Sequence, residues 1–367
     1  MVLPKHHNPV KTGRQSGVLG HSGLPTFWVK LWNWEFWSFP VVYASLGFLH
    51  VWQSIKARSF FYMAASNPGL ENSGFIGERK STIMHSLPPG FQPAWFLVHP
   101  AENGAEWVLD ELEKAGLRFP VICKPNIGER GRGVKRIESE TDLLHYHVAI
   151  GVDYLIQGFV DLPLELGVFY YRLPGTERGT VSSIVLKKFL EVTGDGQSTL
   201  RELVQTYPRA RFVARALEQK FSEDWGKVVP EGQVVALEGI GNHCKGTTFL
   251  DANGHINSKI NRAFDQVAGQ IPGFYFGRFD IRAASWEAVE AGEFQILELN
   301  GAGAEPGHIY QPGYPFLKGQ KVLWDHWIAL FKISVANHKE GVSYWNWSQA
   351  REIRKAHQKA LASIGIS

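Results

Sequence analysis

Cysteine is scarce in this chain of 367 residues, which holds Cys123 and Cys244 and no others. Two cysteines cannot form the disulfide framework of a small secreted domain, and they fit a reducing compartment. Their isolated positions give no support for a metal–thiolate site.

An excess of charge of one sign is also lacking, because the net charge is only +3. No basic stripe alternates with aromatic residues, so the sequence does not predict a nucleic-acid partner. The runs G-x-S-x-G and H-E-x-x-H, which indicate serine hydrolases and zinc proteases, are absent as well.

A long hydrophobic run is missing too. The apolar stretch 36–52 is interrupted by Ser38, Pro40, Ser45 and His50, whereas a spanning helix needs roughly 20 predominantly apolar residues. We therefore expect no transmembrane helix. Because this run begins near Phe36, the N-terminus also lacks the order of a signal peptide. Residues 1–26 have no periodicity and are expected to form a mobile tail.

Residues 277–300 contain the densest group of polar residues suited to chemistry. Segments 277–283 and 293–300 are predicted to be two strands joined by a loop. Side chains at i and i+2 of a strand share a face. Arg278 therefore lies with Asp280, and Glu298 with Asn300. If the strands pair antiparallel, these oxygen donors gather as Mg²⁺ requires. The alternative is a surface hairpin with solvated charges, which the surrounding apolar residues make less suitable.

The pattern R-x-D, followed about eighteen residues later by E-x-N, resembles the metal-binding signature of the ATP-grasp enzymes. The members that it resembles are of the D-alanine–D-alanine ligase, glutathione synthetase and cyanophycin synthetase type. This resemblance implies ATP and Mg²⁺ as cofactors, with Asp280, Glu298 and Asn300 as metal ligands. It also implies that Arg278 stabilises the developing charge on the transferred group.

A predicted strand at 119–125 ends near Lys124 and leads into a loop that contains Gly128, Gly131 and Gly133. Exposed backbone N–H groups in such a loop can cradle phosphates, and a lysine adds a point charge. A glycine-spaced loop alone is weak support. Together with the strand and the lysine, it resembles the phosphate-binding loop of the family.

Two further segments extend the resemblance. The run 155–169 resembles the hinge, which implies that Gln157 and Phe159 lie near the adenine and that Glu165 holds the ribose. The run 192–204, V-T-G-D-G-x-x-T-L-x-E-L-V, resembles cyanophycin synthetase and contains a predicted capping box. It implies a phosphate contact from Lys187, with Lys188 as the alternative.

The substrate contacts are less defined by the sequence. A polar, glycine-rich stretch and a later loop occupy the places where relatives bind their substrates. The candidates there are Asn242, His243, Lys245, Thr247, Glu305 and His308. Arg79, Lys80 and Ser81 form a further group that can grip a phosphate or carboxylate, or can simply begin a helix.

Residues 27–62 are unusually aromatic, with 13 aromatic side chains in the segment. Trp residues flanked by Lys30, Lys56 and Arg58 suit the interface of a membrane. The alternatives are a helical cap that is buried on the enzyme core and a contact with a second subunit.

The resemblance covers 95–312 and predicts an α+β ATP-grasp fold in which two subdomains, 94–157 and 158–312, clasp ATP. The predicted flanking regions are the tail 1–26, a mainly helical region 27–93 that replaces the usual Rossmann-like domain, a closing helix in 313–340 and a solvated basic helix in 341–367.

The implied function is an ATP-dependent ligase that joins a carboxylic acid to an amine through an acyl phosphate and releases ADP and phosphate. Its partners are small molecules in the cytoplasm, with peripheral contact at the inner face of a membrane as one option. The alternatives are a small-molecule kinase on the same fold, a membrane-attached nucleotide-binding protein without turnover, and a role of the aromatic segment in self-association.

Overall fold

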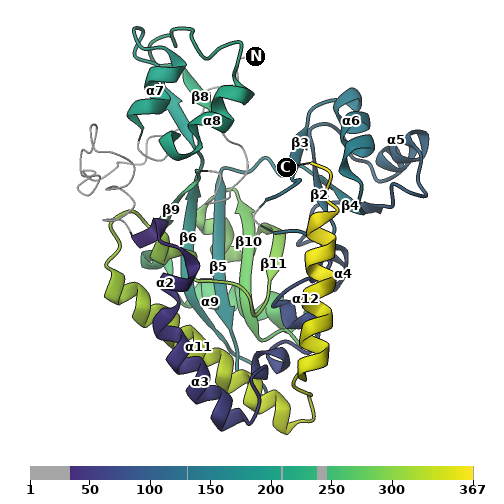
Figure 1. The fold of residues 1–367 in the computed structure, drawn as a ribbon, viewed down its shortest axis with the longest axis vertical. Coiled ribbons are helices and arrows are strands. Elements are labelled where there is room, and N and C mark those ends of the chain that lie inside the picture. Colours follow the sequence, from purple (N-terminus) through teal and green to yellow (C-terminus); the bar gives the residue numbers. More distant parts are fainter. Residues whose placement is uncertain (1–33, 130, 208–209, 238–245, 367) are drawn as a thin grey trace.

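The computed structural model describes residues 34–129, 131–207, 210–237 and 246–366. Within these residues the strands form one sheet of four, one sheet of five and a separate pair, and helices cover the sheets (Figure 1). The predicted α+β class is confirmed. The predicted tail, 1–26, lies outside the described residues.

The first sheet has the order β1-β4-β2-β3 and is antiparallel throughout. Side chains from its strands and helices form one apolar core, because the strands point one face towards the helices. The elements are β1 (Trp95–Val98), α5 (Ala105–Lys114), β2 (Val121–Pro125), β3 (Lys135–Ile137), α6 (Glu140–Ile150) and β4 (Tyr154–Gly158).

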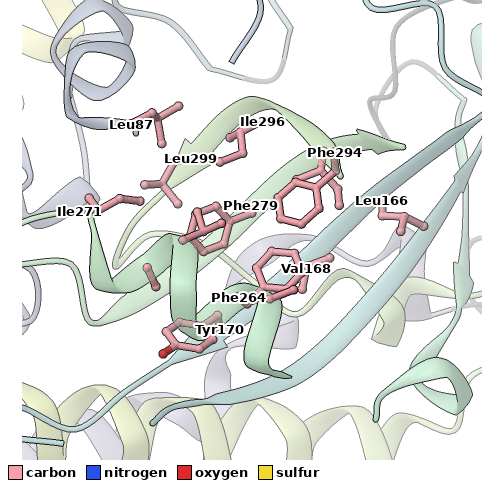
Figure 2. Packing of buried hydrophobic residues seen from close by; sticks show 14 of the residues in the cluster. Leu87, Leu166, Val168, Tyr170, Phe264, Ile271, Phe279, Phe294, Ile296 and Leu299 are labelled. Carbon is pink, nitrogen blue, oxygen red and sulfur yellow. The ribbon is translucent and has the colours of Figure 1, made fainter. Parts of the chain in front are cut away.

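The second sheet has the order β11-β10-β5-β6-β9 and is also antiparallel. One of its faces packs on α9, where the ring of Phe264 lies 5.0 Å from Phe294 and 5.4 Å from Phe279 (Figure 2). The elements are β5 (Leu164–Tyr171), β6 (Thr180–Lys188), β9 (Thr248–Asp251), η5 (Asn253–His255), α9 (Ser258–Gly269), β10 (Phe276–Ala283), α10 (Trp286–Ala291) and β11 (Phe294–Asn300).

The connection between β10 and β11 was predicted to be a loop but contains the short helix α10. Ser285 caps this helix by accepting a hydrogen bond from the backbone N–H of Ala288, and Gly292 ends it with a left-handed backbone conformation. These local signals, a serine N-cap and a C-terminal glycine, override the loop prediction.

A small additional unit was not separated from the second subdomain by the sequence. It has its own apolar cluster and contains β7 (Glu191–Thr193), α7 (Leu200–Thr206), α8 (Ala210–Lys220) and β8 (Val234–Ala236). The predicted capping box is present, because Thr199 and Glu202 each accept a hydrogen bond from the other's backbone N–H.

The described part of the aromatic segment, from Trp34 on, packs on the rest of the protein along one of its faces. Helix α3 (Ala44–Ala57) runs beside the long helix α11 (Phe316–Lys339), and Trp34 is buried against Phe316 with 5.6 Å between the ring centres (Figure 1). The other short elements are η1 (Trp34–Phe36), α2 (Phe39–Val42), η2 (Tyr62–Ala65), η3 (Glu71–Gly74), α4 (Lys80–Ser86) and η6 (Gly307–Tyr310). Among the described residues, no helix is both long and apolar enough to cross a membrane.

The C-terminal helix α12 (Trp347–Ala362) lies where the sequence predicted a solvated basic helix. Most of its residues are exposed, but His357 is buried and the chain then returns to the first sheet. There Ile364 enters the apolar core, and the N–H of Gly365 donates to the carbonyl of Ile150 at 2.9 Å. The last turn therefore anchors the helix through apolar burial that its charged sequence does not reveal.

Candidate functional site

A cavity of about 630 Å³ lies between the two larger sheets. Its walls come from β2, β4 and the glycine loop on one side, from the second sheet on the other, and from the N-terminal segment at one end. The charged residues that line it include Lys80, Lys124, Glu165, Lys187, Arg278, Asp280, Arg282, Glu298 and Glu305.

The antiparallel pairing of β10 and β11, the condition for the predicted metal site, is present. Asp280 lies directly opposite Glu298, and Arg278 opposite Asn300. All four residues line the cavity. Because directly opposed residues of an antiparallel pair are close neighbours, the register alone brings two carboxylates and an amide into one small region.

Arg278 and Asp280 form a bidentate ion pair, in which Nε donates to Oδ1 at 2.9 Å and Nη2 donates to Oδ2 at 3.2 Å. A third donor, Nη1, reaches the backbone carbonyl of Glu305 at 3.2 Å. These bonds fix the plane of the guanidinium group. The remaining exposed part of the group is held facing the cavity.

Lys187 occupies the centre of a buried charge network. Its Nζ lies 3.3 Å from Asp280 Oδ2 and 3.4 Å from Glu165 Oε1, and Glu165 also accepts a hydrogen bond from Arg282 Nε at 2.9 Å. The neighbouring Lys188 is exposed and does not line the cavity. Since adjacent strand residues point to opposite faces, the fold distinguishes two lysines that the sequence left as alternatives.

Glu298 is held between two ammonium groups. Lys80 Nζ lies 2.8 Å from Glu298 Oε1. Burial alone would raise the pKa of the Glu298 carboxyl, but the charges of Lys80 and Lys124 outweigh burial and lower its pKa to about 2. Glu298 is therefore a stable anion, as a metal ligand must be.

The group at 79–81 separates in the structure. Lys80 lines the cavity, and Ser81 is buried with its N–H donating to Asn126 Oδ1 at 3.0 Å. Arg79 points away to the exposed surface and pairs with Glu71 at 3.0 Å. The sequence suggested this group as an anion grip, and Lys80 is the member that faces the cavity.

Lys124 lines the cavity near Glu298. It donates from Nζ to Gln157 Oε1 at 2.7 Å and to the carbonyl of Leu297 at 3.1 Å. Burial and the nearby charge of Lys80 lower the pKa of Lys124 to about 8, although Glu298 acts in the opposite direction. The buried Gln157 Nε2 has no hydrogen-bond partner among the described residues, which suits a ligand with acceptor atoms.

The three glycines of the predicted phosphate loop have different surroundings. Gly128 and Gly131 line the cavity, whereas Gly133 does not. Gly133 has a φ of +71°, and an added Cβ would lie 2.7 Å from Pro125 Cγ. A glycine is therefore required at position 133 for the turn and for packing against β2, and not for contact with a ligand.

Phe159 and Glu165 line the cavity where the resemblance places the nucleotide base and ribose. The guanidinium carbon of Arg136 lies 4.2 Å from the centre of the Phe159 ring, and that of Arg282 lies 5.2 Å from it. Both oxygens of Glu165 take part in ion pairs, one with Lys187 and one with Arg282. A ribose contact from Glu165 would have to share these oxygens, so this role stays a prediction.

The residues predicted to contact the substrate lie in different surroundings. Asn242, His243 and Lys245 lie outside the described residues. Thr247 is buried and is not among the described residues that line the cavity. His308 is also buried away from the cavity, where its Nδ1 lies 2.6 Å from Ser183 Oγ. Because η6 turns the His308 side chain towards β6, the cavity gives no support for a substrate contact from His308, and that role stays a prediction.

Glu305, the other member of that loop, does line the cavity and is held by two tyrosines. Tyr310 donates its hydroxyl to Glu305 Oε2 at 2.9 Å, and Tyr43 donates to Oε1. No sequence pattern indicated Tyr43, because it lies more than two hundred residues from its partner. Arg282 was also not predicted as a site residue. It lies two residues after Asp280 in the same strand, so the strand period places both side chains on the face that lines the cavity.

The metal ligands implied by the resemblance fit this arrangement. Asp280 and Glu298 provide carboxylate oxygens, and Asn300 lies beside them with its buried Nδ2 lacking a hydrogen-bond partner in the described chain. Rotation of this amide presents Oδ1 in its place. Across the described residues, no group of three or more His, Cys, Asp and Glu side chains is arranged to hold a metal, so a bound Mg²⁺ would complete its shell with Asn300, phosphate oxygens or water.

The environment of Glu305 leads to a pH-dependent prediction. Burial raises the pKa of its carboxyl from 4.5 to about 7, against the lowering effect of the Tyr310 hydrogen bond. The folded protein therefore holds this proton more tightly than the unfolded chain does. The resulting stabilisation is complete below pH 4.5 and is lost as the pH rises to about 7.

The unfolding free energy should therefore decrease less between pH 4.5 and about pH 7 in Glu305→Gln than in the unchanged protein. Urea denaturation of both proteins at about pH 5 and about pH 7.5 measures the difference. Glu218→Gln, on the exposed surface of α8, is the control. An unchanged pH slope in Glu305→Gln would contradict the prediction.

Comparison with known proteins finds similarity in structure and none in sequence. No known family description and no curated protein matches the chain. Its structure is similar to that of a bifunctional glutathione synthetase from Pasteurella multocida, with 12% identity and a TM-score of 0.33. This match covers 66% of the present chain and 35% of the other, so the chain spans about a third of that protein's length.

Two D-alanine–D-alanine ligases are also similar. The enzyme from Bacillus anthracis is 14% identical with a TM-score of 0.42, and the match covers 72% of this chain and 69% of that one. The enzyme from Coxiella burnetii is 12% identical with a TM-score of 0.38, covering 77% and 61%. TM-scores this low do not by themselves assign an activity.

Proposed function

We propose that the chain is an ATP-grasp ligase that joins a carboxylic acid to an amine and releases ADP and phosphate. The observation that carries this proposal is the arrangement of Asp280, Glu298 and Asn300 beside the cationic groups of Lys124 and Lys187 in one cavity between two sheets. This combination suits a metal–nucleotide complex, because carboxylates hold the ion and lysines neutralise phosphate charge.

The residues divide the proposed work by their positions. Asp280, Glu298 and Asn300 would hold Mg²⁺, which when bound supplies positive charge to the transferred phosphoryl group. Lys124, Lys187 and the loop containing Gly128 and Gly131 would bind the phosphates. Arg278 is fixed by Asp280 in a geometry that can stabilise negative charge developing on the transferred phosphoryl group and on the oxyanion of the tetrahedral intermediate. No side-chain nucleophile is needed for the formation of an acyl phosphate.

The part of the cavity beside Arg278 has the features of an amine site. Glu305 is a carboxylate with a raised pKa, held in place by Tyr43 and Tyr310 and located beside Arg278. A carboxyl group with a pKa near neutrality can accept the proton that an amine must lose before it attacks. In the proposed reaction, the amine would attack the acyl phosphate and displace phosphate.

The product balance tests this proposal. The protein should be incubated with MgATP and pooled carboxylic acids and amino acids, and the products identified by mass spectrometry. We expect ADP and phosphate in equal amounts with an amide. Hydroxylamine in place of the amine should trap the activated acid as a hydroxamate.

Stoichiometric AMP and pyrophosphate would indicate adenylation and reject the acyl-phosphate mechanism. Accumulation of a phosphorylated substrate in the presence of every amine would instead support a kinase. Omission of Mg²⁺ with excess chelator is the control, and it should abolish the formation of ADP, phosphate and amide.

A further inference from the structure

Helix α3 has an apolar stripe on the face opposite to its buried one. Leu46, Leu49 and Gln53 are buried, and the helix packs against α11. The outer stripe follows the spacing i, i+3, i+4 and i+7, which places its members on one side of a helix. Its residues and their exposed fractions are Phe48 (80%), Val51 (54%), Trp52 (50%) and Ile55 (72%).

The stripe continues beyond the end of the helix. Phe60 is 44% exposed and stacks on Trp347, which is 65% exposed, with 5.3 Å between the ring centres. An apolar surface of this size is seldom left in contact with water. Its residues are exposed among the described residues, and helix α3 itself lies at the lower edge of the ribbon in Figure 1.

The charges within the segment that carries α3 are all of one sign. The sequence contains no Asp or Glu from residue 36 to residue 70. Lys56 and Arg58 are exposed at the end of α3, and Lys56 Nζ lies 3.8 Å from the centre of the Trp52 ring. The outer face therefore combines aromatic and aliphatic side chains with cations, the composition that favours the headgroup region of a membrane.

We propose that the outer face of α3 binds a lipid surface that carries anionic headgroups. Anionic lipids supply the charge that complements Lys56 and Arg58. A second copy of the chain would bring the same cations to the contact, with no acidic residue in this segment to neutralise them. Because α3 has 14 residues, it is about 21 Å long, shorter than the roughly 30 Å hydrocarbon core. The helix therefore lies along the surface and does not cross it.

Vesicle flotation of the full-length protein tests this proposal independently of any enzymatic activity. The probes are phosphatidylcholine vesicles with and without phosphatidylglycerol. We expect the protein to float with the anionic vesicles and to be released by high salt. The double variant Phe48→Ser/Ile55→Ser should bind at least about tenfold more weakly. Lys56→Ser/Arg58→Ser should lose the preference for anionic lipid.

Val148→Ser is the matched control, because Val148 is 85% exposed on α6 and belongs to the first subdomain, away from α3 (Figure 1). It should float like the unchanged protein. Melting curves followed by circular dichroism confirm that each variant is folded, as expected for changes at exposed positions.

Two outcomes would overturn the proposal. The first is that the folded, unchanged protein fails to float with anionic vesicles, or that the stripe variant floats equally well. The second is a dimer in solution that Phe48→Ser/Ile55→Ser dissociates, which would assign the face to a second copy of the chain. Light scattering during size-exclusion chromatography detects that dimer.

Discussion

Replacement of Glu298 by alanine is expected to lower turnover at least ~10²-fold, a loss of about 2.7 kcal/mol in transition-state stabilisation. The change removes a proposed metal ligand and also leaves the ammonium groups of Lys80 and Lys124 without their shared carboxylate. Affinity for MgATP, measured by calorimetry, should fall together with ADP release in the product assay.

Glu218→Ala removes an exposed carboxylate on α8 and should leave turnover unchanged. Since a surface change of this kind rarely affects stability by more than about 0.5 kcal/mol, it controls for the general effect of substitution. Near-normal turnover in a folded Glu298→Ala protein would reject the assignment of this cavity as a metal–nucleotide site.

The second large effect is expected from a pair of neighbouring lysines. Lys187→Met should lower turnover by about 10²- to 10³-fold, because one preorganised cation facing a developing negative charge contributes about that much. Lys187 is buried between Glu165 and Asp280 in the cavity, whereas Lys188 is exposed on the other side of the strand. Lys188→Met should therefore retain most of the activity.

The comparison between these two variants is informative because they differ by one position and remove the same group. Lys187→Met also leaves two buried carboxylates with less compensation, so its melting temperature must be measured beside its activity. Equal losses in both variants, or a loss that follows the melting temperature alone, would contradict a specific phosphate contact from Lys187.

Local sequence patterns predicted the parts of the site that depend on one strand or one turn. The strand period placed Arg278 on the same face as Asp280. The same period places Arg282 on that face, although Arg282 was not predicted as a site residue. The capping box at Thr199 also followed from the sequence, because a cap involves atoms only a few residues apart. Such short-range interactions need no knowledge of the rest of the fold.

Contacts between distant segments could not be predicted in this way. Lys80 meets Glu298 across 218 positions, and Tyr43 meets Glu305 across 262. The sequence contained each residue but no pattern that joined them. His308 shows the same limit in reverse, since its neighbour Glu305 enters the cavity while His308 turns towards Ser183.

The amino-acid sequence by itself determined the α+β class, the two acidic strands and the glycine loop after Lys124. The tertiary structure decided which charges meet, which of Lys187 and Lys188 faces the cavity, and which side of α3 is buried. The physical reason is that strand and helix periods arise from neighbouring residues, whereas burial is shared among segments far apart in the chain. A charged side chain acquires its partner and its pKa when those segments pack together and exclude water from the space between them.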